Sequence, residues 1–501
     1  MKSLIVLILS GICATLFAQD QLQNRTLSQE ELIEDFHFYR DILENTHPGL
    51  YRYNEKSEMQ NTLDSVAALL DRDMNFYDFY RILASVNASV RCAHSFIIPY
   101  RDFDAYVMQK AKGIPFYIYP AEEDMIVIFN GSDNELIKPG FALTAVNGRP
   151  MEEIKEELMN LYWEDGYNIG GRRKVLEGPV FSTFYYSLID QPDEFTLTFK
   201  DESGNEYEVK TAAKSFAETQ KSFKKNPANK QVLKVFKNAK DKNWNFKILK
   251  DVESTAYLRF TGFADPKAVS NESSAKLMKD FMLSVMEKVE AKKIENLILD
   301  LRDNAGGWDA MGIELYKFLS NTDQQFEYYG KGFAVTNDTA YLKYSDLNAA
   351  DIASLNEELI PQPDGTYLIN PEFDKSAQDL KPYEERFKGQ LYILINRGTG
   401  SAASEFAAIA RSNKIGIIVG EEAGGAYEGM NGSSFLRFEL PNSKMYVRTP
   451  LVSSTLAVKP VDEAGRGVMP DFEVQFRRGD VISRNDRQLK FVKQLIRESD
   501  E

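Results

Sequence analysis

Residues 397–406 read Arg-Gly-Thr-Gly-Ser-Ala-Ala-Ser-Glu-Phe and directly follow the apolar run of residues 391–396. This pattern predicts a buried strand that turns through glycines into a helix beginning at Ser401. A serine at this place most often caps its helix. The same place puts a hydroxyl beside free backbone N–H groups at the positive end of the helix dipole, where a negative oxygen is stabilised. Ser401 is therefore either a helix cap or a nucleophile, with the N–H of Ala402 as an oxyanion donor.

Residues 299–307 form a second turn of the same kind, with the sequence Leu-Asp-Leu-Arg-Asp-Asn-Ala-Gly-Gly. Gly306 and Gly307 let the backbone expose its N–H groups without obstruction by side chains. Exposed amides at the start of a helix stabilise negative charge that develops on an oxygen. A tight turn with a salt bridge from Arg302 explains the same residues equally well.

Strand and helix patterns alternate on both sides of these turns. The expected strands cover residues 256–260, 294–301, 391–396 and 415–420, and the expected helices cover residues 274–291, 310–319 and 401–412. Such alternation is typical of a mainly parallel sheet covered by helices, so we expect an α/β core.

The rest of the chain divides into regions of different pattern. Apolar residues recur at helical spacing before residue 113, and short strand patterns follow. Residues 210–250 hold twelve lysines and two acids, which is typical of a solvated linker. The predicted organisation is a signal peptide (1–18), an N-terminal helical region (19–112), a β-rich domain (113–213), a lysine-rich linker (214–253), a catalytic core (254–480) with an insertion at about 321–389, and a C-terminal helix (481–501).

The first eighteen residues have the pattern of an export signal. Lys2 precedes a short apolar run, and cleavage is predicted after Ala18. A lipid anchor on Cys13 is the minority alternative. After cleavage only Cys92 remains, which excludes an intramolecular disulfide and a zinc site built on cysteines. We expect an exported chain, periplasmic or extracellular, with no later segment apolar enough to cross a bilayer.

The net charge and the spacing of the histidines exclude some classes of partner and cofactor. A formal net charge of −15 argues against nucleic acid or an anionic membrane as the main partner, because both would repel the chain. The histidines, His37, His47 and His94, are too scattered to form a recognisable metal site. No metal or other cofactor is therefore predicted.

A serine nucleophile needs a base, because its hydroxyl is hardly ionised at neutral pH. His94 is the best candidate, on an expected loop between a helix and a strand, and His47 is its competitor. Cys92, two residues before His94, suggests an alternative cysteine nucleophile. A free cysteine is more often a small buried hydrophobe.

Five stretches, in their order along the chain, resemble a known family of peptidases. The family includes the C-terminal processing (tail-specific) proteases, the tricorn core protease and the retinoid-binding repeats of the photoreceptor matrix. The stretches are the segment around His94, residues 139–148, residues 300–307, residues 399–402 with 419–421, and residues 467–471. The resemblance implies a multidomain α/β protein with a PDZ-like domain over residues 113–213 and a crotonase-like peptidase core.

The same resemblance assigns chemistry to individual residues. It makes Ser401 the nucleophile, and it makes the N–H groups of Gly307 and Ala402 the oxyanion hole. His94 matches the base of the tricorn-like branch, which uses serine and histidine.

The chain departs from the family in two places. The processing-protease branch uses a lysine shortly after its serine, but residues 424–429 contain none, so a lysine base would require Lys444 to fold back. The tricorn-like branch has a glutamate shortly before the stretch that matches residues 467–471. Glu463 is the residue we expect in that role, orienting the histidine.

These observations predict an exported serine peptidase that acts on peptides or unfolded proteins through an acyl-enzyme on Ser401. Two alternatives stay open. One is a non-catalytic protein on the same fold that binds a ligand or peptide, because the lysine is missing and the acid is displaced. The other is a serine esterase that uses the same nucleophile.

Overall fold

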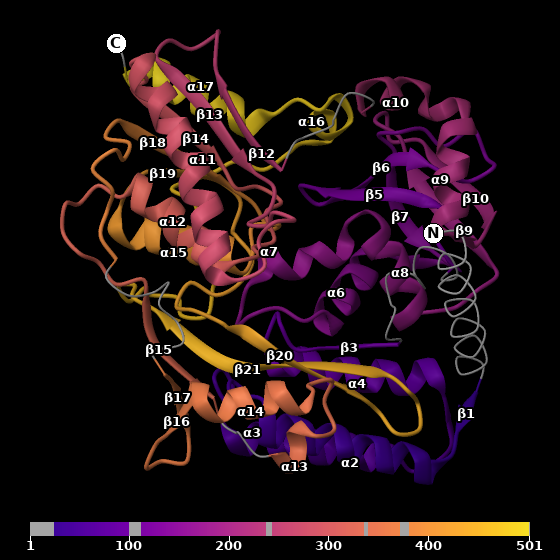
Figure 1. The fold of residues 1–501 in the computed structure, drawn as a ribbon. Coiled ribbons are helices and arrows are strands. Elements are labelled where there is room, and N and C mark those ends of the chain that lie inside the picture. Colours follow the sequence, from indigo (N-terminus) through magenta and orange to yellow (C-terminus); the bar gives the residue numbers. More distant parts are fainter. Residues whose placement is uncertain (1–24, 100–111, 237–242, 335–338, 371–379, 500–501) are drawn as a thin grey trace, which may run out of the picture.

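A computed structural model describes residues 25–99, 112–236, 243–334, 339–370 and 380–499, and the expected signal peptide lies outside them. The described residues form an α/β core, a β-rich middle unit, and a layer of helices crossed by a long hairpin (Figure 1). No described helix is long and apolar enough to span a membrane.

The core is built on a six-stranded sheet. Its strands, in spatial order, are β12 (Trp244–Ile248), β13 (Thr255–Phe260), β14 (Asn296–Asp300), β18 (Gln390–Ile395), β19 (Ile417–Gly420) and β22 (Phe472–Glu473). β12 runs antiparallel to β13, and the other neighbouring strands are parallel. This sheet confirms the predicted α/β class.

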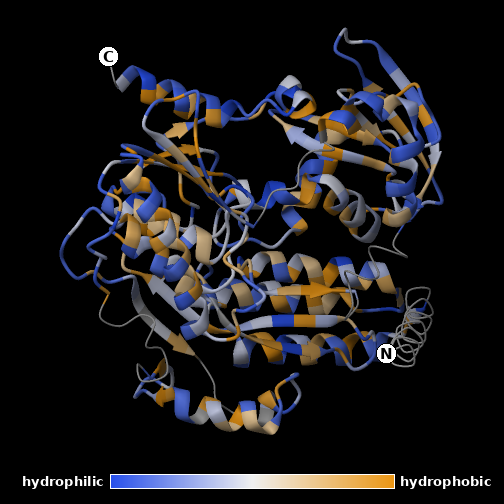
Figure 2. Ribbon diagram, turned by 45° about the horizontal axis from the view of Figure 1, so that its top comes forward, coloured by the Kyte–Doolittle hydropathy of each residue, from blue (hydrophilic) through white to orange (hydrophobic). Residues whose placement is uncertain are grey.

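Helices cover both faces of the core sheet, because successive side chains of a strand point to opposite faces. Leu297 and Leu299 pack with the helices α11 (Asn271–Ala291), α12 (Asp309–Leu319) and α15 (Ala402–Asn413). Ile298 faces the other side, where it packs with α17 (Arg487–Ser499). In Figure 2 hydrophobic residues concentrate in the strands and the helix faces turned toward them, whereas the connecting loops are mostly hydrophilic.

The middle unit holds an antiparallel sheet with the order β10-β9-β7-β6-β5. Its strands are β5 (Phe116–Ala121), β6 (Asp124–Asn130), β7 (Ala142–Val146), β9 (Glu194–Lys200) and β10 (Glu206–Ala212), with β8 (Arg149–Pro150) beside β7. Two helices, α6 (Met151–Leu161) and α8 (Gly178–Leu188), pack on this sheet. These elements occupy the region in which we expected short strands.

The prediction that residues 214–253 form one separate linker is wrong. Its first part folds into α9 (Phe216–Lys225) and α10 (Lys230–Phe236) beside the middle unit, and its last part is β12 of the core sheet. Asn229 shows why the first part is fixed, since its side chain donates to the Asn130 carbonyl (2.7 Å). Lysines on one exposed face do not prevent the opposite face from packing.

The predicted insertion and the predicted N-terminal helical region belong to one unit. A hairpin of β20 (Asn431–Glu439) and β21 (Tyr446–Leu456) leaves the core and runs across the helices (Figure 1). β15 (Tyr329–Ala334) pairs with β21 and carries β17 (Tyr367–Ile369) and β16 (Leu359–Pro361), and the short β3 (Phe96–Ile98) pairs with the other part of β21.

Three long helices form the layer beside this hairpin: α2 (Gln29–Thr46), which packs on β21, α3 (Lys56–Leu69), which packs on α2 and α4, and α4 (Phe76–Val90), which packs on β3. The two carboxylate oxygens of Asp35 on α2 accept hydrogen bonds from the backbone N–H groups of Asn442 (2.7 Å) and Ser443 (2.8 Å) at the hairpin tip. The shorter helices α13 (Thr339–Leu342) and α14 (Ala349–Glu358) come from the insertion.

A buried ion network joins the end of β14 to the C-terminal helix. Asp300 is fully buried and pairs with Arg302 (2.6 Å), which also pairs with Asp486 (2.7 Å) just before α17. Burial alone would raise the pKa of the Asp300 carboxyl, but Arg302 and Arg259 lower it to about 2. The network therefore holds the carboxyl end of β14 in place.

Replacing Arg302 by alanine should lower the free energy of unfolding by about 3 kcal/mol, because the buried Asp300 loses its main charged partner and keeps only Arg259 (3.2 Å) and the Tyr257 hydroxyl (2.6 Å). Urea denaturation followed by circular dichroism measures this loss. Arg411→Ala is the matched control, since its pair with Asp471 is partly exposed and should be worth less than about 1 kcal/mol. Equal losses in the two variants would contradict the role of burial.

Candidate active site

The two glycine-rich turns lie against each other at the carboxyl ends of β14 and β18. These strands are parallel neighbours, so both turns leave the same edge of the sheet. The Gly400 N–H donates to the Asn304 carbonyl (2.9 Å), and the Thr399 hydroxyl donates to the Leu301 carbonyl (2.8 Å). The sequence placed these turns on separate stretches, and the structure joins them into one site.

Gly306 and Gly307 are required by this close approach. Gly306 has φ +96°, and a Cβ there would lie 2.6 Å from the Ser401 Cβ. Gly307 has φ +135°, and a Cβ there would lie 2.2 Å from the Phe263 carbonyl oxygen. A side chain at either position would therefore strain the backbone. At Gly306 it would also push the two turns apart, and at Gly307 it would push against the backbone of Phe263.

Ser401 stands at the N-cap position of α15, but its side chain makes no capping hydrogen bond. Its backbone has φ 50° and ψ −134°, a conformation that costs a residue other than glycine about 1–3 kcal/mol. Neither the Gly307 N–H nor the Ala402 N–H takes part in the backbone hydrogen bonds between the turns. The hydroxyl is thus not used for capping, and both predicted oxyanion donors lie at the same turn contact.

Ser401 and Gly307 open onto a cavity of about 530 Å³. The insertion supplies one wall, the hairpin β20–β21 supplies another, and the starts of α11 and α12 supply the rest. The lining residues from the insertion are Leu355, Glu358, Leu359 and Ile369, and those from the hairpin are Ser434, Phe435, Leu451 and Val452. The cavity is large enough to hold several side chains of a peptide.

His94 lies on the loop between α4 and β3. Its ring stacks on Phe435, which lines the cavity of Ser401, with 5.5 Å between the ring centroids. Burial, together with the positive charge of Arg448, lowers the pKa of the His94 imidazole to about 4. In the described part of the chain the Nδ1 atom of His94 is buried without a hydrogen-bond partner, and no hydrogen bond joins His94 to Ser401. The structure therefore places His94 against a residue that lines the cavity of Ser401, without a hydrogen bond between His94 and Ser401.

A comparison with known families identifies the domain that holds both turns. Residues 254–474 match peptidase family S41. These residues form an S41 peptidase domain. The match confirms the peptidase family that was predicted from the sequence motifs. The matched residues include both glycine-rich turns and Ser401.

Two solved structures of CPAF share the fold over most of this chain. The crystal structure of mature CPAF is similar over 94% of this chain and 98% of the other, with a TM-score of 0.62 at 14% identity. Mature CPAF complexed with lactacystin is similar over 93% and 98%, with a TM-score of 0.62 at 14% identity. The photosystem II D1 C-terminal processing protease gives a TM-score of 0.39 at 13% identity, over 89% and 93%. At these identities the similarity shows the fold alone, and none of the curated proteins matches the sequence.

Asp165 is a residue of this site that the sequence did not reveal. It lies on a loop of the middle unit, and its carboxylate accepts a hydrogen bond from the N–H of Ala93, the neighbour of His94 (2.9 Å). Burial and the adjacent Glu164 raise the pKa of Asp165 to about 7. Glu164 in turn accepts from the Gly425 N–H (3.1 Å) of the S41 domain. This loop thus connects the loop of His94 to the S41 domain.

The structure does not bring Glu463 to His94. The Glu463 side chain is 73% exposed and pairs with Arg466 (3.0 Å) on the surface of the S41 domain. Lys444 is not at the cavity of Ser401 either. It pairs with Glu439 (3.5 Å) at the tip of the hairpin, next to the contact with α2. A lysine base from Lys444 has no support in this arrangement.

His47 and Cys92 are the other candidates for the base and the nucleophile, and both lie in surroundings typical of structural residues. Burial lowers the pKa of His47 to about 3, and its Nδ1 atom accepts a hydrogen bond from the Gly49 N–H (3.1 Å). Burial raises the pKa of the Cys92 thiol to about 12, so the nucleophilic thiolate is scarcely populated at neutral pH.

Among the described residues, no cluster of histidine, cysteine, aspartate and glutamate is arranged to hold a metal ion.

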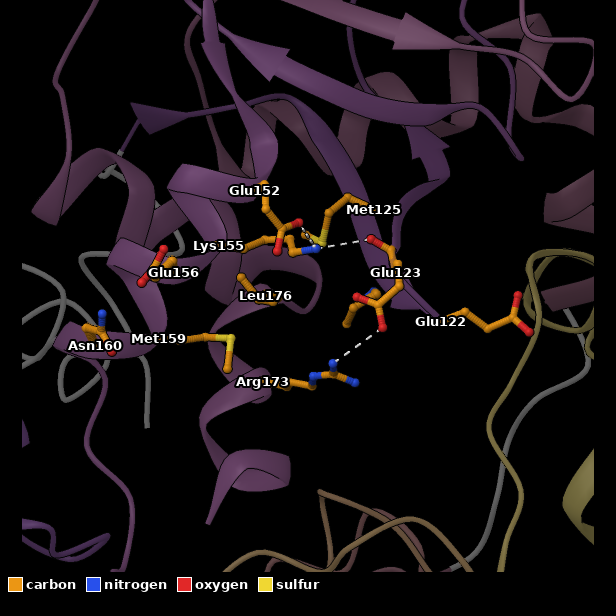
Figure 3. Close-up of a pocket in the computed structure, with 11 residues that line it drawn as sticks. Glu122, Glu123, Met125, Glu152, Lys155, Glu156, Met159, Asn160, Arg173 and Leu176 are labelled. Carbon is orange, nitrogen blue, oxygen red and sulfur yellow. Dashed lines mark hydrogen bonds and ion pairs between the residues drawn. The ribbon is translucent and has the colours of Figure 1, made fainter. Parts of the chain in front are cut away.

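A second hollow, of about 260 Å³, lies in the middle unit (Figure 3). Lys155 and Arg173 both point toward Glu123 there, and Lys155 also pairs with Glu152 (2.6 Å). Its lining holds no serine, histidine, cysteine or threonine among the described residues.

Gly306→Ala should lower the reactivity of Ser401 toward a serine-directed probe by about 100-fold, because the added methyl displaces the nucleophile. Rates of labelling by a fluorophosphonate measure the effect. Gly204→Ala is the matched control, since Gly204 has φ +86° but open space around a Cβ, and it should leave labelling unchanged. Similar rates in the two variants would contradict the contact between the turns.

Proposed function

We propose that this protein is an exported serine-type peptidase that hydrolyses peptides or unfolded proteins through an acyl-enzyme on Ser401. The observation that carries the proposal is the strained, uncapped Ser401 beside Gly307 at the wall of a large cavity within an S41 domain. A cap would lower the energy of α15, so a serine here without capping favours a chemical role.

In the proposed reaction, Ser401 Oγ attacks the carbonyl carbon of a bound peptide while His94 accepts its proton. The N–H groups of Gly307 and Ala402 stabilise the negative oxygen of the tetrahedral intermediate. His94 then gives the proton to the leaving amine, and water releases the acyl group by the reverse steps. The ring of His94 must form its hydrogen bond to Ser401 when substrate binds, because no such bond is present among the described residues.

The export part of the proposal rests on residues 1–18. Their pattern of one lysine, an apolar run and small residues supports transport to the periplasm or the exterior. Cys92, the single cysteine of the mature chain, is buried and free, so stability in that compartment depends on the packed cores and not on a disulfide.

A fluorophosphonate probe should label the protein, and Ser401→Ala should abolish the labelling. Ser404→Ala is the matched control, because its hydroxyl lies in the same turn of the helix and donates to the Ser401 carbonyl (2.8 Å). Cys92→Ala tests the cysteine alternative and should be labelled like the wild type. Absence of labelling in the folded wild type would overturn the proposal and favour a non-catalytic binding protein.

The labelling rate should follow the neutral form of His94 and fall only as the pH drops through about 4, where that imidazole becomes protonated. An ordinary histidine would lose half its base form near pH 6.5. Rates are measured from about pH 4.5 to pH 8 in the wild type and in Asp165→Asn, which removes the carboxyl whose pKa is about 7. An inflection near pH 6.5 that persists in both proteins would contradict the lowered pKa of His94.

A further inference from the structure

The cavity at Ser401 combines an apolar lining with negative charge. Its buried apolar side chains include Leu355, Leu359 and Leu451, each at most 8% exposed. Its charged lining residues are Asp309 and Glu358. Among the described residues that line the cavity there is no lysine, arginine or histidine.

Glu358 is the last residue of α14, at the negative end of that helix. A carboxylate there opposes the helix dipole, so it does not stabilise α14. Its side chain accepts a hydrogen bond from the Ser354 hydroxyl (2.6 Å), which holds the carboxylate without neutralising it. The negative charge at this wall therefore acts on whatever occupies the cavity.

Asp309 adds a second carboxyl to the lining, at the start of α12 and two residues after Gly307. Burial and the charge of Asp309 raise the pKa of nearby Glu405 to about 8, so Glu405 is neutral at neutral pH. Glu405 also accepts a hydrogen bond from the Tyr329 hydroxyl (2.8 Å).

The start of α11 also reaches the cavity, and the positive end of a helix favours anions. This end is already occupied, because the Ser270 side chain accepts a hydrogen bond from the Ser273 N–H (3.1 Å). It therefore offers little compensation to an acidic side chain of a substrate.

We propose that this cavity selects peptides in which a large apolar residue is flanked by lysine or arginine, and rejects peptides with acidic residues at the same place. The apolar walls bury the first side chain, and Asp309 with Glu358 attracts the cationic neighbour. This inference rests on the proposed function for its link to cleavage, but selection by charge is a property of binding and is tested separately.

The test uses three peptides that differ only in the residue beside a leucine, which is lysine, glutamine or glutamate. Their binding to Ser401→Ala protein is measured by fluorescence polarisation, and their cleavage by the wild type is measured by mass spectrometry. We expect the lysine peptide to bind about tenfold more tightly than the glutamate peptide, with glutamine between them. Equal binding, or tighter binding of the glutamate peptide, would overturn the inference.

Charge reversal at the wall supplies the matched pair of variants, each made in the Ser401→Ala background. Glu358→Lys should invert the order of binding, whereas Glu357→Lys, at the exposed neighbouring position of α14, should leave it unchanged. An equal effect of both variants would assign the preference to net charge and overturn the inference. If the binding order holds but the folded wild type neither cleaves the peptides nor reacts with a fluorophosphonate, the proposed function fails and the selection by charge stands.

Discussion

The hydrogen bond from the Gly400 N–H to the Asn304 carbonyl is the contact on which the site depends (2.9 Å). It holds two strand-to-helix turns so closely that Gly306 lies against Ser401 with no room for a side chain. The strain at Ser401 costs about 1–3 kcal/mol, and it persists because the parallel strands beneath it over-determine where the turns meet. The same contact places the N–H groups of Gly307 and Ala402 next to the uncapped hydroxyl.

The rest of the molecule brings distant segments to this contact. The hairpin β20–β21 extends from the core to the N-terminal helices, pairs with β3 and carries Phe435, on which His94 stacks. The insertion adds β15 to the same hairpin and closes the cavity with α14 and β17. The middle unit contributes the loop of Asp165, which holds the backbone beside His94. The core, the insertion and the hairpin therefore line the cavity. The N-terminal region and the middle unit act one step away, through the loop of His94.

Sequence patterns predicted the parts of this site that depend on local structure. The strands β14 and β18 and the glycines after them follow from apolar runs and backbone freedom, and the ordered motifs identified the family. Glu463 was chosen by its distance along the chain from a motif, and its side chain is on the surface. Asp165 gave no signal, because its role depends on a contact with Ala93, 72 positions away. The many lysines of residues 214–253 led to the prediction of a linker where two helices and a strand form. A count of charges does not show which face of a helix is buried.

The charges around the cavity follow from how deeply each carboxyl is buried. Asp165 and Glu405 are almost completely shielded from water. Burial raises the pKa of Asp165 to about 7 and that of Glu405 to about 8, so each carboxyl is protonated much of the time and carries less negative charge. Glu358 is only partly buried and sits at the wall of the cavity, where water reduces the cost of its charge. A peptide that fills the cavity removes that water, and the interaction between Glu358 and the peptide becomes stronger as the local dielectric falls. Selection by charge therefore develops on binding, as the same peptide excludes water from the wall of the cavity that holds Ser401.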